Sequence, residues 1–558
     1  MLRLSAICAV FASTLAVSPV FAADTTVVKS QPGSNYFGID VSDAVNFSGN
    51  SGSLLFTQPQ KPLQINEVQT EYSRLCSSLA LEFCNPNKVA ISAIAVLGPC
   101  QGNYSNPCID SVDVTDKNGT THSLTFEKFV DGPEFKGDAS YNLPDGKTTS
   151  LWGSKTLQGT QNFSVRYAIE YGTKAVSENL FSPKTMSVSI SPYVKRSHPQ
   201  AKRIDFAEVP PSDPIFKMTN GNIKSIGAGS YEINCAWQEN GICGVEQEFE
   251  KDFTYQIAIV IPKSFSGWLQ GRLVSPEIEV NTISSDFNLM KVSAKAADVP
   301  RVVVDVDYSK KNEVFAEVFK GLFAYEMNSG IRLGIFSDNI NSTKFLNAFA
   351  SFTNNQANIK TTRWSFKNNS FVSTLNTNKC LYSDSKLMGM VTTNSLIYES
   401  GVPAFKEGFL EYKVAGLHLN PDGTEFLGAY DLILRSEAAR CLYNFSSSPV
   451  SAEISVTGSE GEKKVATTRV SEENGWLHLG AYNFTFSEPT IKMLLKQEAL
   501  VLAPNPSPSP SPLAQSQQES EQILKKLSKK ITIFCIKGKQ TRKISAVNPK
   551  CPLGYKKK

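Results

Sequence analysis

Three glutamates stand at alternate positions of the segment VEQEFEKDF (245–253). Glu246, Glu248 and Glu250 would share one face of a β-strand, because successive strand side chains point to opposite faces. Such a row can bind Ca²⁺ through its oxygens, supply the carboxylate pair of a glycosidase, or protect an exposed edge strand from aggregation. We predict the edge strand, with calcium as the alternative, and give the run DVDY (305–308) the same interpretation.

Other catalytic motifs are missing from the sequence. The four histidines, His122, His198, His418 and His478, stand far apart, and no H-E-x-x-H, G-x-S-x-G or phosphate-binding glycine-rich loop occurs. His478, in WLHLGAY, is predicted to be a strand residue rather than a ligand. The sequence therefore identifies no catalytic residue and no metal site, and a non-enzymatic role is favoured while an enzyme stays open.

Trp237 lies between two cysteines in CAWQENGIC (235–243). A tryptophan displayed on a disulfide loop can stack on a sugar ring, whereas the simpler interpretation is an indole packed over its own disulfide. Four other tryptophans stand in apolar alternation and are predicted to be core residues: Trp152, Trp268, Trp364 and Trp476.

The last 28 residues, ITIFCIKGKQTRKISAVNPKCPLGYKKK, carry eight basic side chains and no acidic one. We predict that they bind an anionic polymer of the cell envelope; the residues are Lys537, Lys539, Arg542, Lys543, Lys550, Lys556, Lys557 and Lys558. The alternatives are a solubilising tail, docking on the acidic body, or a signal for export machinery. Nucleic acid is not expected, because stacking aromatics are sparse.

Charge is distributed unevenly along the chain. Residues 523–558 hold 12 Lys or Arg and no acid, whereas residues 23–522 hold 43 basic and 52 acidic residues. The body is therefore acidic and the tail strongly basic, although the whole chain is only +4.

The first 22 residues have the features of a secretory signal peptide. Arg3 precedes the apolar stretch Leu4–Val17, and Val20 and Ala22 fit a cleavage site after Ala22. No later stretch reaches 18 apolar residues, so no membrane span is predicted. We expect a secreted, extracellular or cell-wall-associated protein.

Ten cysteines remain after the signal peptide, and an even number in an exported chain indicates disulfides. Pairing of neighbours closes local loops; the expected pairs are Cys76–Cys84, Cys100–Cys108, Cys235–Cys243, Cys380–Cys441 and Cys535–Cys551. Zinc ligation is disfavoured, because no C-x2-C occurs and histidine is rare. Sequence alone does not fix the connectivity.

Strand patterns dominate the body. FSVRYAIEY (163–171), FTYQIAIVI (253–261) and MSVSIS (186–191) alternate apolar residues with period two, and DKNG, LPDG and NPDG mark turns. Helical spacing occurs in 311–326 and 342–352, the latter capped by Asn341 or Ser342. We predict a mainly β protein of tandem, immunoglobulin-like β-sandwiches with minor helix.

The predicted regions are, in order, a signal peptide (1–22), β-rich regions at 23–200 and 201–310, a mixed segment at 311–375, a β-sandwich at 376–502, a Pro/Ser linker at 503–518 and a basic module at 519–558. PNPSPSPSP favours polyproline II and spans roughly 28 Å at ~3.1 Å per residue. Beyond it, SEQILKKLSKK is expected to form a short helix, and ITIFCIK and TRKISAV a hairpin linked by Cys535 and Cys551.

Part of the chain resembles a known pattern. FLEYKVAGLHLNPDGTEFLGAYDLILRSEAARCLYNFSSSPVSAEISVTG, continued by KKVATTRVSEENGWLHLGAYNFTFSEPTIKMLLK, is similar to a recurrent C-terminal β module (about 409–497) of secreted actinobacterial surface proteins. CIKGKQTRKISAVNPKCPLGY resembles the Cys-Lys tail (531–558) that ends such proteins. The resemblance implies a bacterial envelope setting and carries no activity or catalytic residues.

Taken together, these features predict a secreted, non-enzymatic adhesin or ligand-binding protein that its basic module retains at the cell surface. Its body would bind a glycan or a protein. The alternatives are a secreted hydrolase of surface polysaccharide and a structural envelope component. The sequence does not define the oligomeric state.

Overall fold

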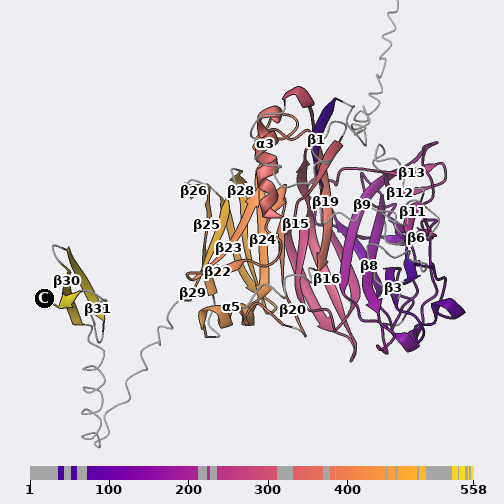
Figure 1. Cartoon of the computed structure of the whole chain (residues 1–558), viewed down its shortest axis with the longest axis horizontal. Helices are drawn as coiled ribbons and strands as arrows, with labels where there is room; N and C mark the ends of the chain where they lie inside the picture. The colour runs from indigo at the N-terminus through magenta and orange to yellow at the C-terminus, as the bar shows by residue number, and fades with distance from the viewer. Residues whose placement is uncertain are drawn as a thin grey trace, which may run out of the picture. The chain divides into compact units, whose positions relative to one another are not determined.

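The computed structural model describes residues 35–42, 52–58, 72–102, 104–210, 223–226, 235–310, 331–368, 378–383, 385–446, 450–458, 463–464, 466–486, 489–497, 531–537, 540–546, 551 and 555–557. The chain divides into two compact units, residues 1–498 and 499–558, which Figure 1 shows together. The predicted signal peptide, the helix at 311–326, the Pro/Ser linker and the helix that begins the basic module lie outside the described residues.

One long sheet runs through the first unit and is called the shared sheet. Its strands are paired in the order β2-β3-β8-β9-β19-β15-β20-β24-β28-β27, with β15 and β20 parallel and the other pairs antiparallel. The strands are β2 (Leu54–Thr57), β3 (Ile91–Leu97), β8 (Asn162–Lys174), β9 (Thr185–Ser197), β15 (Gly267–Thr282), β19 (Ile359–Asn368), β20 (Leu387–Thr393), β24 (Leu427–Arg435), β27 (Thr467–Glu473) and β28 (Trp476–Thr485).

A second sheet packs on the first half of the shared sheet and is called the N-terminal cover sheet. It contains β4 (Cys108–Thr115), β5 (Thr121–Ser123), β14 (Thr254–Pro262), β16 (Phe287–Arg301) and the second half of β15. The alternating residues of β8 and β14 that the sequence predicted to be buried form the core between the two sheets. Tyr167 of β8 also donates a hydrogen bond across it, to the carbonyl oxygen of Val260 at 3.0 Å.

The C-terminal sandwich is built on the opposite face of the shared sheet. Its cover sheet follows the order β21-β23-β29-β25-β26, with β22 beside β23. The strands are β21 (Ile397–Tyr398), β22 (Ala404–Lys406), β23 (Phe409–Ala415), β25 (Val450–Thr457), β26 (Lys463–Lys464) and β29 (Thr490–Gln497). Ile433 of β24 belongs to the N-terminal core, whereas its neighbours Leu432 and Leu434 belong to the C-terminal core. Because strand side chains alternate, the two cover sheets contact different faces.

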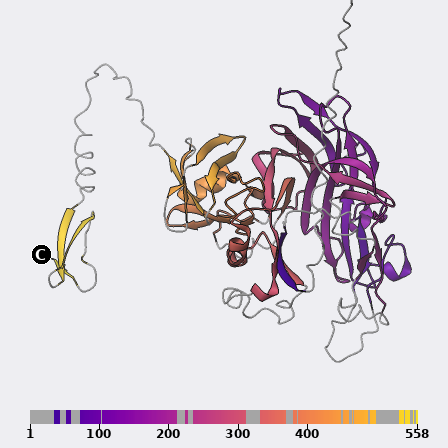
Figure 2. The ribbon, with the colours of Figure 1, turned by 90° about the horizontal axis from the view of Figure 1, so that it is seen from above.

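Seen from above, the indigo-to-magenta strands of the N-terminal sandwich lie beside the orange strands of the C-terminal sandwich (Figure 2). The prediction of a mainly β, tandem-sandwich fold is therefore confirmed. The two sandwiches are joined by hydrogen-bonded strands. Strands from the predicted regions 23–200 and 201–310 also pair with each other, β4 with β14 and β9 with β13.

The first strand of the body completes a separate small sheet. β1 (Tyr36–Ser42) lies between β17 (Val303–Asp307) and β18 (Ile331–Phe336), antiparallel to the former and parallel to the latter. Phe37, Ile39 and Val41 pack with helix α3 (Thr343–Thr353) in a core of their own. The predicted second helix is thus confirmed; Ser342 is its N-cap residue, but its side chain makes no capping bond.

Short elements complete the first unit. They are β6 (Thr125–Phe129), β7 (Ser150–Gly153), β10 (Asp205–Ala207), β11 (Lys224–Ile226), β12 (Cys235–Glu239), β13 (Ile242–Glu246) and helix α5 (Ser436–Tyr443). Short 3₁₀ turns occur at Glu82–Cys84, Ala139–Tyr141, Tyr308–Lys310 and Ile340–Ser342. β7 pairs with the start of β8, and β13 pairs with the end of β9.

The second unit is a sheet in the order β31-β30-β32. Its strands are β30 (Ile531–Lys537), β31 (Gln540–Ala546) and β32 (Lys556–Lys557). The predicted hairpin is confirmed, and all five predicted disulfides are present. The third strand was not predicted, because two lysines carry no strand signal by themselves.

Candidate functional site

The basic module fixes part of the C-terminal lysine run in its sheet. Cys535 in β30 is fully buried, and it pairs with Arg542 on one side and with Lys557 on the other. Its disulfide to Cys551 connects the end of the hairpin to the central strand. Lys556 and Lys557 are exposed. At least these two cations therefore belong to a cross-linked sheet.

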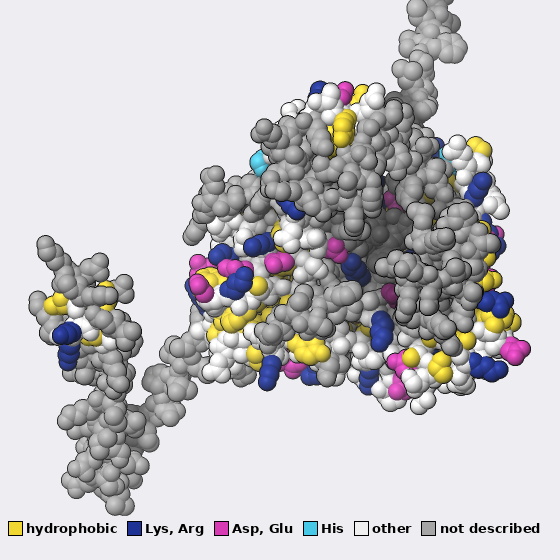
Figure 3. All heavy atoms as spheres, in the orientation of Figure 1, with side chains coloured by type: hydrophobic (Ala, Val, Ile, Leu, Met, Phe, Trp, Pro, Cys, Tyr) yellow, Lys and Arg dark blue, Asp and Glu magenta, His cyan; other side chains and the backbone are white. Residues whose placement is uncertain are grey.

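The remaining predicted polyanion-binding residues are described less fully. Lys537, Arg542 and Lys543 occupy strand positions in β30 and β31, while Lys539, Lys550 and Lys558 lie outside the described residues. In Figure 3, dark-blue and hydrophobic side chains are visible on this unit, and basic and acidic side chains are mixed over the visible face of the body.

The three glutamates of 245–253 do not form a row. β13 ends at Glu246, because the next partner on β9 is Pro192, which has no N–H to donate. Glu246 forms a salt bridge with Arg363 at 2.9 Å, and Glu250 accepts a hydrogen bond from the Thr160 amide at 3.1 Å. The prediction that the three glutamates share one face of a strand is therefore wrong.

The DVDY acids have separate structural partners. Asp305 accepts two hydrogen bonds from the guanidinium of Arg332, at 2.9 and 2.5 Å. Asp307 accepts from the Ser309 amide at 2.9 Å, and hydrogen bonds from Ser309 lower its pKa. Among the described residues, no group of three or more His, Cys, Asp or Glu side chains could hold a metal ion.

Trp237 is fully buried, so the alternative in which it is displayed for a sugar ring is wrong. The indole makes an edge contact with Tyr193, with ring centroids 5.2 Å apart, and packs with Val130 and Leu151. Its cross-strand partner is Gly244, where a Cβ atom would approach the indole Nε1 to 2.2 Å. The glycine leaves the space that the ring fills. The four tryptophans predicted to be core residues are buried.

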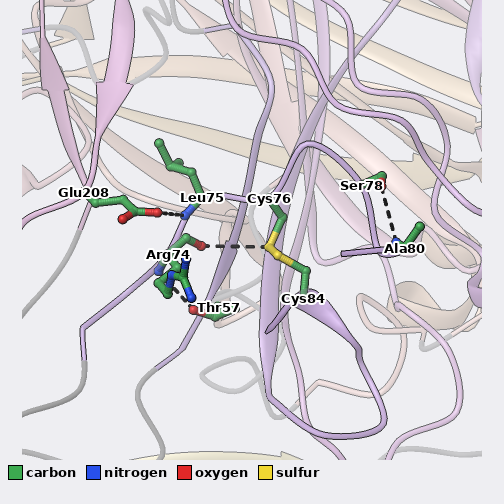
Figure 4. Close-up of a disulfide and its surroundings, with 8 residues drawn as sticks. All are labelled: Thr57, Arg74, Leu75, Cys76, Ser78, Ala80, Cys84 and Glu208. Carbon is green, nitrogen blue, oxygen red and sulfur yellow. Dashed lines mark hydrogen bonds between the residues drawn. A yellow bond between two sulfur atoms is a disulfide. The ribbon is translucent and has the colours of Figure 1, made fainter. Parts of the chain in front are cut away.

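The Cys76–Cys84 loop is held by contacts with distant segments (Figure 4). The Leu75 amide donates to the Glu208 carboxylate at 3.0 Å, and the Arg74 amide donates to the Thr57 hydroxyl at 3.0 Å. The guanidinium of Arg74 also lies 3.7 Å from the ring centroid of Phe83, inside the loop. Both sulfurs are buried, so this disulfide has a structural role.

A polar cluster that the sequence analysis missed lies where β15 leaves the shared sheet. Asp431 of β24 is buried, on the same face of the strand as Ile433. Its carboxylate accepts hydrogen bonds from the Ser275 amide at 3.0 Å, from the hydroxyl of Tyr482, and from the Thr392 hydroxyl at 3.5 Å. The Ser275 hydroxyl donates in turn to Tyr482 at 3.2 Å. Four strands, β15, β20, β24 and β28, thus meet at one carboxylate.

Local backbone features position this cluster. Ser275 has a φ of 51°, and the pairing of β15 with β16 shifts register between Val274 and Glu277. This kink directs β15 from the shared sheet into the N-terminal cover sheet. Gly480 is the cross-strand partner of Asp431, and a Cβ there would lie 2.4 Å from the Tyr482 hydroxyl. The glycine therefore allows Tyr482 to reach back to Asp431.

Burial raises the pKa of Asp431 to about 6, and the hydrogen bonds from Tyr482 and Ser275 oppose that rise. Burial also lowers the pKa of His478, which follows Leu477 on β28, and Arg469 lowers it further. A buried carboxyl with a raised pKa is a feature that functional sites often share.

The residues of this cluster are far apart in sequence: Ser275 is 156 positions from Asp431 and 207 from Tyr482. Two local signals could have pointed to it. An aspartate interrupts the apolar run AYDLILR, and a glycine stands two residues before a tyrosine in LGAY. Neither signal identifies its partner on another strand.

Comparisons with known proteins name no class for this fold and site. No protein-family model matches the chain, and no curated protein is similar to it. In the described part of the chain, no helix is long and apolar enough to cross a membrane. The five disulfides are typical of proteins that fold in an oxidising compartment.

Proposed function

We propose that the chain is a secreted, non-enzymatic protein of the bacterial cell envelope, retained there by its basic C-terminal module. The observation that carries the proposal is a separate, disulfide-linked unit with exposed Lys556 and Lys557 next to the buried disulfide. The body, which holds more acids than bases, acts as an adhesin or ligand-binding platform for a glycan or a protein.

An anionic polymer is the partner that this charge distribution fits best. Twelve basic residues without an acid in 523–558 repel other cations and attract a chain of phosphates or carboxylates. The contacts are exposed, so dissolved salt screens them over about 10 Å at 0.1 M ionic strength. Binding should therefore weaken steadily as salt rises. The actinobacterial resemblance of 531–558 supports the same setting.

The experiment compares surface retention of the full chain with that of a chain lacking 519–558, in the producing bacterium. We expect the deletion to release the protein into the medium, and added salt to release the intact protein. Unchanged retention of the shortened chain would remove the module's assigned role.

A charge-matched pair of variants separates charge from fold. Lys556→Glu, Lys557→Glu and Lys558→Glu together should reduce retention, because they reverse three charges at the end of the module. The control carries the same change at Lys117, Lys155 and Lys251, which are exposed on the body. Equal loss in both variants would assign retention to overall charge.

The role of the body is tested by a binding screen of the full chain against surface glycans and envelope polymers. A bound, chemically unchanged ligand supports an adhesin or ligand-binding protein. Release of cleaved sugar by the purified chain would replace that proposal with a hydrolase.

A further inference from the structure

The joint between the two sandwiches contains a buried carboxylate whose hydrogen bonds all come from neutral groups. Asp431 accepts from the Ser275 amide and from the hydroxyls of Tyr482 and Thr392. No salt bridge among the described residues includes it. A buried carboxylate without a cation in contact is stabilised less than it is in water, so its neutral form is favoured.

This carboxylate lies where the C-terminal part of the shared sheet meets the strand that crosses to the N-terminal cover sheet. Asp431 belongs to β24, in the half of the shared sheet that carries the C-terminal sandwich. Ser275 belongs to β15 at the kink where that strand enters the N-terminal cover sheet. The hydrogen bond from the Ser275 amide to Asp431 therefore connects the C-terminal part of the shared sheet to the strand that crosses over.

We propose that Asp431 is a proton-operated clasp between β24 and the kink of β15, and that taking up a proton strengthens this attachment. The proposal is independent of the basic module. The clasp consists of Asp431, Ser275, Tyr482 and Thr392.

The hydrogen-bond chain can accept a proton without moving its heavy atoms. A proton from water binds the Asp431 oxygen that faces Tyr482, and the carboxyl then donates to the Tyr482 oxygen. The Tyr482 hydroxyl turns toward the Ser275 oxygen, 3.2 Å away. The half-buried Ser275 hydroxyl turns outward. Each polar group keeps a partner while the buried negative charge disappears.

The charged and titratable groups around the clasp come from three strands. A guanidinium nitrogen of Arg469 on β27 lies 3.5 Å from a carboxylate oxygen of Glu277 on β15, and both charges act on the pKa of His478 on β28. Arg469 favours the charged form of Asp431 but does not overcome burial. Glu473 acts on His478. Because the pKa of His478 is lowered, its titration weakens the fold on acidification, opposite in sign to Asp431.

The sign for Asp431 follows from linkage. Its pKa is about 6 in the folded chain and close to 3.8 when unfolded, so the folded state binds more protons between these values. Stability from this group is therefore greatest at low pH and is lost as pH rises through about 6. Carboxyls with lowered pKa, such as Glu239 and Glu472, act in the opposite direction below about pH 4.5.

The test measures denaturant unfolding of the full chain and of Asp431→Asn at about pH 7.5 and about pH 5. We expect the stability difference between the two proteins to change by roughly tenfold in the unfolding equilibrium constant, in favour of the native chain at the lower pH. Other groups, His478 included, cancel in this comparison. An equal difference at both pH values would overturn the proposal.

Two further variants keep the test decisive if Asp431→Asn folds poorly. Gly480→Ala retains Asp431 but displaces the Tyr482 hydroxyl, so the carboxylate loses a donor and the pH dependence should move to higher pH. Asp298→Asn makes the same chemical change at a side chain that is 58% exposed and should leave the pH dependence unchanged.

The location of the effect is read by hydrogen exchange of residues 267–282, corrected for the intrinsic effect of pH. We expect this segment to exchange more slowly at about pH 5 than at about pH 7.5 in the native chain, and equally at both in Asp431→Asn. An unchanged exchange rate in this segment, with slower exchange elsewhere in the body, would contradict a local clasp.

Discussion

The body and the basic module differ in the interactions that stabilise their folds. In the body, the faces of the shared sheet pack against two cover sheets and bury large apolar cores. The module is a sheet of three short strands whose central Cys535 is buried in a disulfide. A unit this small cannot bury enough apolar surface to fold without a cross-link. We therefore expect apolar burial to dominate the stability of the body and the Cys535–Cys551 cross-link to dominate that of the module.

The largest loss of stability is expected from a cavity in the core of the body at Trp364. This residue is 1% exposed, and its indole N–H donates to the Ala294 carbonyl at 3.0 Å. Trp364→Ala should lower the free energy of unfolding of the body by about 3–5 kcal/mol, because it leaves a cavity and an unpaired carbonyl. Denaturant unfolding followed by circular dichroism measures this loss.

Trp364→Phe is the matched control, since it keeps an aromatic ring and removes only the indole donor and part of the volume. It should cost clearly less than the alanine variant. Equal losses in both variants would mean that the hydrogen bond, and not burial, dominates at this position.

The second-largest loss of stability is expected in the module. Replacing Cys535 and Cys551 by serine removes a constraint worth about 3 kcal/mol on the chain-entropy model. The module should then unfold while the body keeps its own unfolding midpoint. Hydrogen exchange of 531–546 would detect the loss of strand protection.

The same double substitution at Cys76 and Cys84 provides the comparison in the body. Its loop is shorter, with a sequence separation of 8 against 16 in the module, and it is surrounded by packed side chains. We expect a destabilisation of about 2.6 kcal/mol without unfolding. If the module stayed folded and protected from exchange without its disulfide, the expectation that it depends on this cross-link more than the body does would be wrong.

The smallest change in stability is expected from the exposed lysines of the module. Lys556→Ala with Lys557→Ala should change the stability of either unit by less than about 0.5 kcal/mol, because exposed side chains contribute little to folding. The same variant should bind an anionic polymer more weakly, in a salt-dependent way. A large stability loss would show that these lysines hold the sheet together.

The local features of this fold could be predicted from the sequence. Period-two alternation located β8, β9 and β14, and neighbouring cysteines formed the expected disulfides. These features depend on contacts within a strand or a loop. The joining of both sandwiches by the shared sheet was not predicted, because pairings such as β15 with β20 connect segments without a sequence signal for one another.

Distant partners decided the outcome at two positions where the sequence left a binding role open. β13 ends at Glu246: the Gln247 amide donates to the Pro192 carbonyl, on another strand, but Pro192 has no N–H to return the bond. Trp237 is buried because Gly244 leaves room for its ring. Asp431, in contrast, stands in the sequence only as one polar residue in an apolar strand. Its partners Ser275 and Tyr482 lie on other strands, so the sequence does not indicate the cluster.

The small sheet around β1 has a consequence for the order in which the chain can fold during synthesis. β1 is made first, yet its hydrogen-bonding neighbours β17 and β18 are made hundreds of residues later. Phe37, Ile39 and Val41 therefore lack their packing partners on these two strands until β18 has been synthesised. The sheet can therefore close only after β18 has been made.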